Sequence, residues 1–220
     1  MASLAAAEKS LVDTTDDTAI KGIWTCPACG ATKCKDKCAK CMVVFYCSKD
    51  CQKAHWKQHK KVCTQFMEVI DALKEHDMRG VGLPGSWALH WRLKIQENIE
   101  STLTCGYVKE PSGTCFLHTW LEVDNRVYDC ASHVLGYSRK KVKYYKEQPK
   151  GVPRQDMATP MDRARSAELI DGIRKLVNDE DNFRKTWLMN MWMMMGTAVM
   201  HQLFTTEVME KLMGTKLFGF

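Results

Sequence analysis

The spacing of apolar residues changes along the chain and predicts both helices and strands. In residues 64–76 the apolar positions recur at intervals of three and four, as on one face of a helix, and this helix is expected to continue directly from the segment before it. The apolar positions are Phe66, Met67, Val69, Ile70 and Leu73. Residues 77–86 contain three glycines and a proline and are expected to interrupt the helix. A second helix is predicted for residues 86–100.

The middle of the chain shows the alternation of apolar and polar positions that is typical of strands. A strand is predicted near residues 105–110, and residues 115–131 predict a hairpin whose turn is the Asp-Asn pair at 124–125, because both residue types accept positive φ. In the register that this turn imposes, His118 and Asp129 lie on one face as diagonal neighbours, with Cα atoms roughly 7 Å apart. An imidazole held by a carboxylate is the base half of a nucleophilic triad, and it is also an ordinary structural contact.

The last third of the chain is predicted to be mostly helical. A basic stretch at residues 139–151 is expected to be a solvated loop, and a helical part is predicted over 159–213, starting at the threonine-proline pair 159–160. Residues 186–204 are rich in methionine but interrupted by polar residues. They predict a core helix packed against the sheet, or an adaptable partner surface, in preference to a membrane span.

Eight residues of the types that bind metals fall within residues 26–63. They are Cys26, Cys29, Cys38, Cys41, Cys47, Cys51, His59 and Cys63. The first two pairs have the spacing of zinc knuckles, and the last two pairs stand four apart, as on one face of a helix. Four such pairs predict two zinc ions. A zinc closed by four thiolate or imidazole ligands has no position for water or substrate, so both ions are expected to be structural.

Two further residues compete for these ligand positions. Cys34 lies between the first two pairs but has no partner at knuckle spacing. His55 continues the four-residue spacing of Cys51, His59 and Cys63, so the spacing alone allows either histidine on that helical face.

Disulfide bonds are the main alternative use of so many cysteines. The chain begins without the basic and apolar segments of a secretory signal peptide. We therefore expect an intracellular reducing compartment, cytoplasm or nucleus, where disulfides are rare, and interpret the cysteines as metal ligands.

A resemblance to MYND-type zinc fingers covers residues 26–63, with the sequence CPACGATKCKDKCAKCMVVFYCSKDCQKAHWKQHKKVC. The resemblance implies an interleaved cross-brace in which one zinc is held by Cys26, Cys29, Cys47 and Cys51, and the other by Cys38, Cys41, His59 and Cys63. It also implies that metal binding supplies most of the folding free energy of the finger. The function that it implies is recognition of short, often proline-containing segments of partner proteins.

The resemblance to MYND modules directs attention to one strand and one aromatic residue. Met42–Tyr46 is the β-prone run of the finger, and Trp56 lies on the helix that follows. These residues are candidates for an exposed strand and for the floor of a peptide groove. The alternative is that Phe45 and Trp56 form the small core of the finger.

The charge of the finger limits the choice of partner. Residues 21–63 contain ten Lys, no Arg, no Glu and two Asp, a formal charge of +8. Two loaded zinc sites lower this to about +5. The excess favours acidic partners, although lysines also keep a small module soluble. Nucleic acid is a less favoured partner than peptide, because the segment lacks arginine and interleaved aromatic residues.

A second resemblance covers about residues 80–135. The string HTWLEVDNRVYD is similar to the His/Asp segment of transglutaminase-like domains, in which a cysteine at the start of an upstream helix is the nucleophile. The matching segment here, GLPGSWALHW, contains Ser86 and no cysteine. The first interpretation is a degenerate, non-catalytic domain. The alternatives are a hydrolase or acyltransferase that uses His118, Asp129 and Ser86, and an unrelated α+β domain in which His118 is structural.

Together these observations predict an α+β protein in two parts. We expect an N-terminal tail at 1–22, a small double-zinc cross-braced finger at 23–65, and a second α+β domain at 66–220 with a Met-rich helical C-terminal part. The predicted function is zinc-dependent protein interaction, as an adaptor or recruitment protein.

Overall fold

The structure is a computed structural model that describes residues 19–21, 23–78, 82–136, 142–149 and 188–213, together with positions 168, 171, 172, 175 and 179. The predicted N-terminal tail before residue 19 and the predicted helix start at 159–160 lie outside the described residues.

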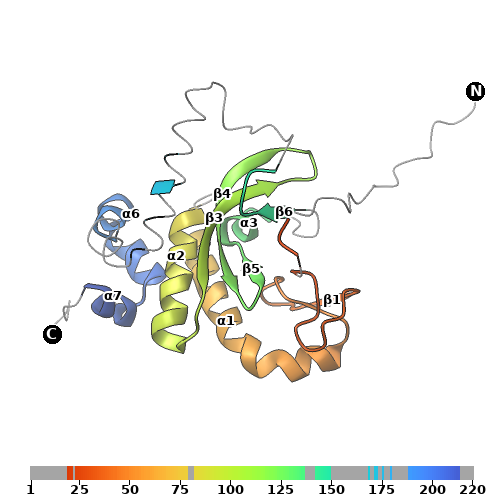
Figure 1. The fold of residues 1–220 in the computed structure, drawn as a ribbon. Helices are drawn as coiled ribbons and strands as arrows, with labels where there is room; N and C mark the ends of the chain where they lie inside the picture. Colours follow the sequence, from red (N-terminus) through yellow and green to blue (C-terminus); the bar gives the residue numbers. More distant parts are fainter. Residues whose placement is uncertain are drawn as a thin grey trace, which may run out of the picture.

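A small finger lies at one end of the ribbon and a sheet with helices at the other (Figure 1). The finger contains two short antiparallel strands, β1 (Asp36–Lys37) and β2 (Phe45–Tyr46). They are followed by α1 (Lys49–Glu75), α2 (Gly82–Arg92) and a π-helical turn (Leu93–Glu97). The chain continues through β3 (Thr102–Lys109), β4 (Cys115–Val123), β5 (Arg126–Tyr128), α3 (Cys130–Val134), β6 (Lys143–Tyr145), α6 (Leu188–Leu203) and α7 (Thr206–Met213). The fold is therefore a mixture of helix and sheet.

The main sheet has four antiparallel strands in the order β5-β4-β3-β6. The β4–β5 hairpin pairs Val123 with Arg126, and its turn residues Asp124 and Asn125 have φ of 48° and 57°. Asp and Asn accept this left-handed conformation more readily than most residues. The predicted turn and register of the hairpin are confirmed.

One uninterrupted helix of 27 residues, α1, runs from the finger into the second unit. It begins after Ser48, whose hydroxyl accepts a hydrogen bond from the backbone N–H of Cys51. The second half of α1 packs against α2, α3 and α6 and buries Phe66 and Ile70 completely. The predicted continuity of the two helical stretches is confirmed, and the expected boundary between residues 65 and 66 falls inside this helix.

Both faces of the sheet carry buried apolar side chains. Successive residues of a strand point to opposite sides, so neighbouring residues contribute to different cores. On one face, Leu121 and Tyr128 join the main core together with α1 and α2. On the other face, Trp120 and Tyr144 form a smaller core under the N-terminal segment. That segment is attached by a hydrogen bond from the backbone N–H of Ile20 to the carbonyl of Tyr144, at 2.8 Å.

A buried arginine ties three helices together. Arg92 of α2 is 3% exposed, donates from Nε to Gln65 Oε1 of α1 at 2.7 Å, and forms an ion pair with Glu68 of the same helix. Its Nη1 donates to the backbone carbonyl of Gln202 in α6 at 3.3 Å. A buried charge is tolerated when it is paired and hydrogen-bonded, so this set of contacts fixes α6 against α1 and α2.

Two predictions for the second unit are wrong in detail. The helix predicted from Ser86 begins at Gly82, because Pro84 is compatible with the first turn, where the missing N–H has no intrahelical acceptor. The basic stretch predicted as a solvated loop contains β6, in which Tyr144 and Tyr145 are buried. Burial of the two aromatic rings stabilises a strand here, although lysines flank it on both sides.

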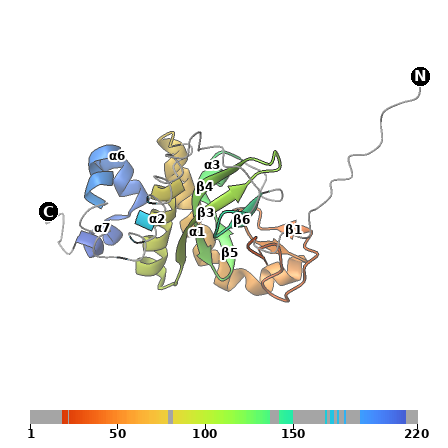
Figure 2. The ribbon, with the colours of Figure 1, turned by 45° about the horizontal axis from the view of Figure 1, so that its top comes forward.

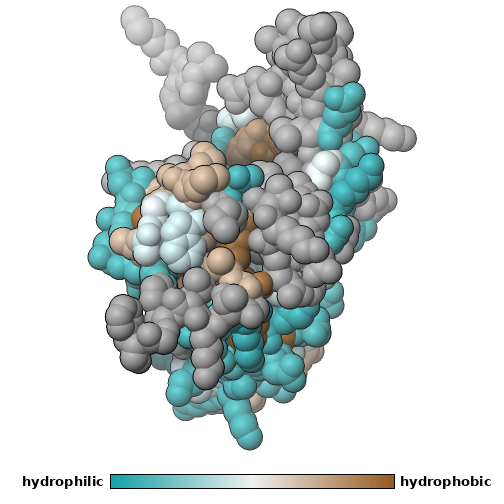
Figure 3. Space-filling view, turned by 90° about the vertical axis from the view of Figure 1, so that its left-hand side faces the viewer, coloured by the Kyte–Doolittle hydropathy of each residue, from teal (hydrophilic) through white to brown (hydrophobic). Residues whose placement is uncertain are grey.

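The Met-rich helix α6 is a core helix, as predicted, because Met200 and Leu203 are fully buried in the main core, but its main packing is not on the sheet. Its neighbours are α1 and α2, and α2 lies between α6 and the sheet in Figures 1 and 2. Gly196, with φ 78° and ψ 162°, breaks α6 into two helical pieces. Met193 and Met194 are 72% and 86% exposed, and Figure 3 shows apolar surface beside grey atoms on the side of the molecule that carries α6 and α7. No helix in the described part of the chain has the length and apolar character needed to cross a membrane.

Candidate metal centre and neighbouring sites

Two groups of four side chains converge in the finger, and within each group all ligand atoms lie within 4.8 Å of one another. The first metal cluster consists of Cys26, Cys29, Cys47 and Cys51, and the second metal cluster consists of Cys38, Cys41, His59 and Cys63. The clusters alternate along the sequence, so each one links the N-terminal loops to the region of α1. The structure thus brings all eight predicted ligands together in the cross-braced pairing that the MYND resemblance implies.

The distances between ligand atoms suit tetrahedral zinc. The sulfurs of Cys29 and Cys47 are 3.4 Å apart, and Cys41 Sγ lies 3.4 Å from His59 Nε2. Zinc bonds of about 2.3 Å to sulfur and about 2.0 Å to nitrogen place tetrahedral ligand atoms roughly 3.5 to 3.8 Å apart. A disulfide would bring two sulfurs to about 2.05 Å, and all cysteines are free. The finger fits two structural zinc ions.

The two knuckles share one backbone geometry. The N–H of Gly30 donates to the carbonyl of Cys26 at 2.8 Å, and the N–H of Met42 donates to the carbonyl of Cys38 at 2.9 Å. Both donors have positive φ, 75° for Gly30 and 56° for Met42. Glycine adopts this conformation without a steric penalty, whereas a residue with a Cβ is destabilised by about 1–2 kcal/mol. The second knuckle is therefore the more strained of the two.

The remaining ligands come from the start and the first half of α1. His59 and Cys63 stand one turn apart on a common face, as predicted. Cys47 was expected to share a helical face with Cys51, but it precedes the N-cap residue Ser48. Its sulfur still lies 3.4 Å from that of Cys51, because the capped chain turns back over the first helical turn.

Clustering makes the cysteines ionise unequally when no cation is bound. Burial opposes ionisation of Cys26, but backbone N–H groups, led by that of Cys47, lower its pKa to about 6. Hydrogen bonds from Cys41 and Cys63 lower the pKa of Cys38. The hydrogen bond with Cys38 raises the pKa of Cys63 in turn. A divalent cation removes this conflict, because it stabilises every thiolate of the cluster at once.

The two metal clusters differ in their access to solvent. Every member of the second cluster is 2% exposed or less, and its cysteines belong to the main core. In the first cluster Cys26 is buried, but Cys29 is exposed and Cys47 and Cys51 are partly exposed. Solvent and chelators therefore reach the first cluster more directly.

Neither of the two competing residues enters a cluster. The thiol of Cys34 donates to the carbonyl of Ala31 at 3.3 Å, and burial raises its pKa. His55 Nδ1 is hydrogen-bonded to the hydroxyl of Tyr46 at 3.0 Å, and its ring stacks on His59 with centroids 5.8 Å apart. His59 is thus the histidine of the second cluster, and His55 packs beside it.

His118 and Asp129 are in direct contact, with Nε2 and Oδ1 2.8 Å apart. Asp129 is fully buried and caps α3 by accepting from the backbone N–H of Ser132 at 2.9 Å. The hydroxyls of Ser132 and Tyr144 donate to the other carboxylate oxygen. One carboxylate therefore joins β4, α3 and β6, which is a sufficient structural reason for the contact.

Ser86, the candidate nucleophile, is not joined to this pair. Its side chain is fully buried in α2, and its hydroxyl has no hydrogen-bond partner among the described residues. It therefore makes no hydrogen bond to His118. A closer approach occurs one helical turn earlier, where a Cβ on Gly82 would lie 3.3 Å from Cε1 of His118. Ser86 and His118 therefore lack the hydrogen bond that a nucleophile and its base share in a triad.

Trp56 is the exposed aromatic residue of the finger, with 39% of its surface accessible. It shares one side of α1 with Lys49, Gln52 and Lys53, and these four residues line an open pocket of about 470 Å³. Their spacing of three, four and seven residues is that of a continuous helical face. This set of four residues is called the Trp56 surface below.

The prediction that Met42–Tyr46 forms an exposed strand is wrong. Val43, Val44 and the two residues of β2 are buried, and only Met42, at 42%, is exposed. Phe45 packs edge-on against Trp24, with ring centroids 5.0 Å apart. Phe45 therefore belongs to the interior of the finger, whereas Trp56 does not.

A larger groove of about 1070 Å³, called the junction groove, lies between the finger and the second unit. Its charged lining consists of Lys21, Lys57, Lys61, Glu100, Asp124 and Arg126. Arg126 is 7% exposed and donates from Nη2 to Thr25 Oγ1 at 3.2 Å, beside the first metal cluster. This role of Arg126 could not be predicted from the sequence, because a single arginine in a hairpin carries no signal of a contact with the finger.

Residues 26–63 match the protein family described as MYND finger. A Drosophila melanogaster protein described as zinc finger MYND domain-containing protein 10 homolog is 59% identical over 39 residues, 18% of this chain and 8% of that protein. A Schizosaccharomyces pombe protein described as SET domain and MYND-type zinc finger protein 6 is 50% identical over 40 residues, with the same shares.

A longer alignment extends beyond the finger. An Arabidopsis thaliana protein described as histone-lysine N-methyltransferase ASHR1 is 45% identical over 76 residues, which are 34% of this chain and 15% of that protein. The chain therefore spans only a small part, 8% to 15%, of the length of these relatives. No solved structure matches the chain. Residues 26–63 are thus a MYND-type zinc finger, and the transglutaminase-like resemblance of residues 80–135 stays a prediction.

Proposed function

We propose that this protein is an adaptor that binds short segments of partner proteins through its zinc finger. The observation that carries the proposal is the exposed indole of Trp56 on a helix that also supplies zinc ligands. Among the aromatic residues that the structure describes, Trp56 is the only exposed one. Large exposed aromatic side chains are frequent anchors of protein interfaces, because they bury much area at a low cost in conformational entropy.

The zinc ions give this surface its shape. Cys51 lies five residues before Trp56 and His59 three residues after it, so the two clusters hold the helix on both sides of the indole. The ring of Trp56 also packs edge-on against His59, at 6.0 Å between centroids. Loss of zinc is therefore expected to remove the binding surface together with the fold of the finger.

The proposal is tested by quantitative capture of partners with the zinc-loaded chain. We expect Trp56→Ala to abolish capture of the main partners while the zinc content stays at two ions per chain, and Trp56→Phe to retain part of the binding. Cys47→Ala should lose both zinc and partners. Leu135→Ala, at an apolar side chain that is 42% exposed on the second unit, is the control. Equal partner lists for Trp56→Ala and Leu135→Ala would contradict the proposal.

A hydrolase or acyltransferase is the second candidate, supported by the contact between His118 and Asp129. The isolated, buried hydroxyl of Ser86 speaks against it. An enzyme of this class requires His118 for turnover, so His118→Gln would abolish hydrolysis of an ester or amide substrate. If His118 is a structural residue, the His118→Gln variant should instead have a lower melting temperature and capture the same partners.

The compartment is part of the same proposal. Eleven free cysteines, three of them outside the finger and its ligand clusters at Cys105, Cys115 and Cys130, support an intracellular, reducing environment. The catalytic activities in the names of the relatives are not carried over, because the aligned stretch covers 15% of the methyltransferase at most.

A further inference from the structure

A row of four lysines follows the first half of α1. Lys49, Lys53, Lys57 and Lys61 stand at intervals of four residues, and all four are exposed. This set is called the lysine ridge below. It begins in the Trp56 surface, which contains Lys49 and Lys53, and ends in the junction groove, which contains Lys57 and Lys61. The ridge thus extends from the Trp56 surface to the junction groove.

The ridge is a concentration of charge with little compensation. Residues 49–61 contain five lysines and one acidic residue, Asp50. Among the described residues, only one lysine of the ridge has an ion-pair partner, Lys61 with Glu97 at 3.2 Å. Like charges four residues apart destabilise a helix. The metal clusters hold this part of the helix in place against the repulsion, and an anionic partner that covered the ridge would relieve it.

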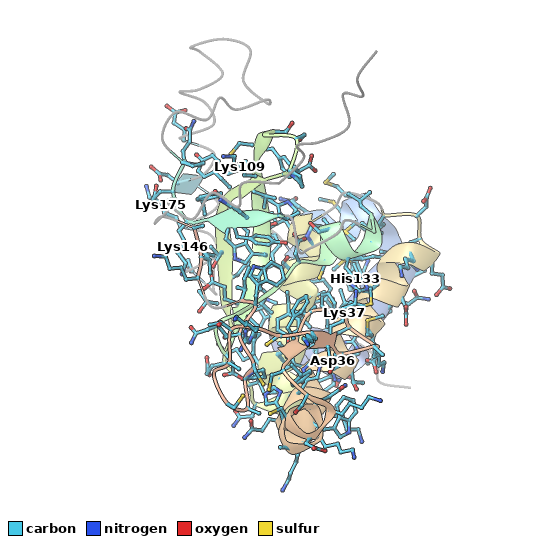
Figure 4. All side chains as sticks on the ribbon, turned by 90° about the vertical axis from the view of Figure 1, so that its right-hand side faces the viewer. Asp36, Lys37, Lys109, His133, Lys146 and Lys175 are labelled. Carbon is cyan, nitrogen blue, oxygen red and sulfur yellow. The ribbon has the colours of Figure 1, made fainter. Side chains whose placement is uncertain are left out.

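The surroundings of α1 leave this ridge open. In Figure 4 the first half of α1 is seen nearly end-on at the lower end of the molecule, below Asp36 and Lys37 of β1, with nitrogen-tipped side chains extending away from it. The opposite side of the same turns carries the ligands Cys51, His59 and Cys63. The helix therefore turns one side to the zinc ions and another to solvent.

The spacing of the ridge matches an extended polypeptide. Successive lysines are about 6 Å apart along the helix axis, because each residue rises 1.5 Å. Alternate side chains of an extended chain lie roughly 6.6 Å apart on one face. The long lysine stems absorb the small mismatch and the inclination of the row. From first to last lysine the ridge is about 18 Å long, the reach of five or six extended residues.

We propose that the lysine ridge binds an extended acidic segment of a partner protein, with acidic side chains at alternate positions and an apolar residue on Trp56. The inference rests on the proposed function, since it names the chemical class of the segment that the finger takes. The segment runs from the Trp56 surface toward the junction groove.

A protein segment fits better than nucleic acid. The ridge has no arginine for bidentate phosphate contacts, and Trp56 is a single stacking platform. At its far end the junction groove is lined by Glu100 and Asp124 as well as by Lys21 and Arg126, so it offers charges of both signs and not a continuous basic track for a polyanion.

The test uses the zinc-loaded full chain and three fluorescent probes. The first probe is an eight-residue peptide with three glutamates at alternate positions and one leucine between the second and the third glutamate, which matches the order Lys49, Lys53, Trp56 and Lys57 along the helix. The second has the same composition with the three glutamates in succession, and the third is a single-stranded oligothymidylate. Two double variants with equal net charge are compared: Lys53→Glu with Lys57→Glu on the ridge, and Lys33→Glu with Lys35→Glu elsewhere on the exposed surface of the finger. Zinc content and far-ultraviolet circular dichroism verify that both variants fold.

The expected result is selective loss in the ridge variant. It should bind the alternating peptide about tenfold or more weakly, and the matched variant less than about threefold more weakly, because short-range charge pairs decide the affinity. The unaltered chain should prefer the alternating peptide over the clustered one. Equal losses in the two variants, or equal binding of the two peptides, would overturn the proposal.

Two other outcomes separate this inference from the proposed function. Tighter binding of oligothymidylate than of peptide, with loss in the ridge variant, would assign the ridge to nucleic acid and overturn the inference. If Trp56→Ala abolishes partner capture while the ridge variant captures the same partners as before, the adaptor function stands and the acidic segment does not.

Discussion

The finger and the second unit differ in the interaction that supplies most of their folding free energy. In the second unit, Leu121, Phe66 and Trp120 are fully buried, and burial of apolar surface supplies the stabilisation. The finger has short strands of two residues each and places two metal clusters where a larger protein has side-chain packing. A chain segment rich in lysine can fold in this way because coordinate bonds, unlike hydrophobic contacts, need only a few side chains.

The comparison is not between two independent bodies, because α1 belongs to both. Its first half carries His59 and Cys63 of the second metal cluster, and its second half carries the apolar stripe that packs under α2, α3 and α6. The buried thiol of Cys63 lies in the same core as Phe66. The difference between the two regions is therefore a change in the source of stability along a single helix.

Removal of zinc should have the largest effect, because it should unfold the finger and leave the second unit folded. A strong chelator is expected to unfold residues 23–63, which include the first half of α1, because structural zinc contributes on the order of 10 kcal/mol to a small finger. The sheet should keep its protection, because its stability comes from apolar burial. Hydrogen exchange followed by mass spectrometry measures both regions in one experiment, and re-addition of zinc is the control. Simultaneous loss of protection in β3 and β4 would show one cooperative unit instead.

A core substitution should act in the opposite sense. Leu121→Ala removes a fully buried side chain from the central strand β4 and should cost about 3 kcal/mol of unfolding free energy. Thermal unfolding of the second unit should occur at a lower temperature while two zinc ions stay bound at 25 °C. Leu135→Ala, at an exposed position, should be nearly neutral. Zinc loss from the folded Leu121→Ala variant would mean that the finger depends on the sheet.

The smallest effect concerns the two knuckles. Met42→Gly should stabilise the zinc-loaded finger by roughly 1 kcal/mol, because it removes the strain of a side chain at φ 56° and gives up little packing at a position that is 42% exposed. The reciprocal change Gly30→Ala should destabilise the finger by a similar amount. Competition with a chelator of known affinity measures both. A weaker zinc affinity of Met42→Gly would show that the methionine contributes contacts to the second knuckle.

The metal centre was the most predictable part of the molecule. Ligand spacing identified the seven cysteine ligands, because thiolates three or four positions apart have few geometries in which they converge. The choice between His55 and His59 needed the family resemblance, since both lie on one helical face. The position of Cys47 was predicted less well, because the N-cap at Ser48 depends on a local hydrogen bond that spacing does not show.

The second unit was predictable where local chemistry dominates. The Asp124–Asn125 turn fixed the register of the hairpin and placed His118 beside Asp129. The strand β6 was missed, because its two buried tyrosines lie among lysines and pair with β3 over a long sequence distance. The location of α6 depended on contacts such as that of Arg92 with Gln202, which no local pattern contains.

The shared helix also decides where this polypeptide can be divided. A fragment that stops at residue 65, the predicted end of the finger, would truncate α1 near its middle and remove Phe66, which is buried in the same core as the last ligand, Cys63. Such a fragment would present Val62 to solvent and tend to self-associate. Extending it to Glu75 would retain the complete helix but uncover the stripe that α2, α3 and α6 normally protect. Point substitutions are therefore better suited than truncations to separating the roles of the two regions.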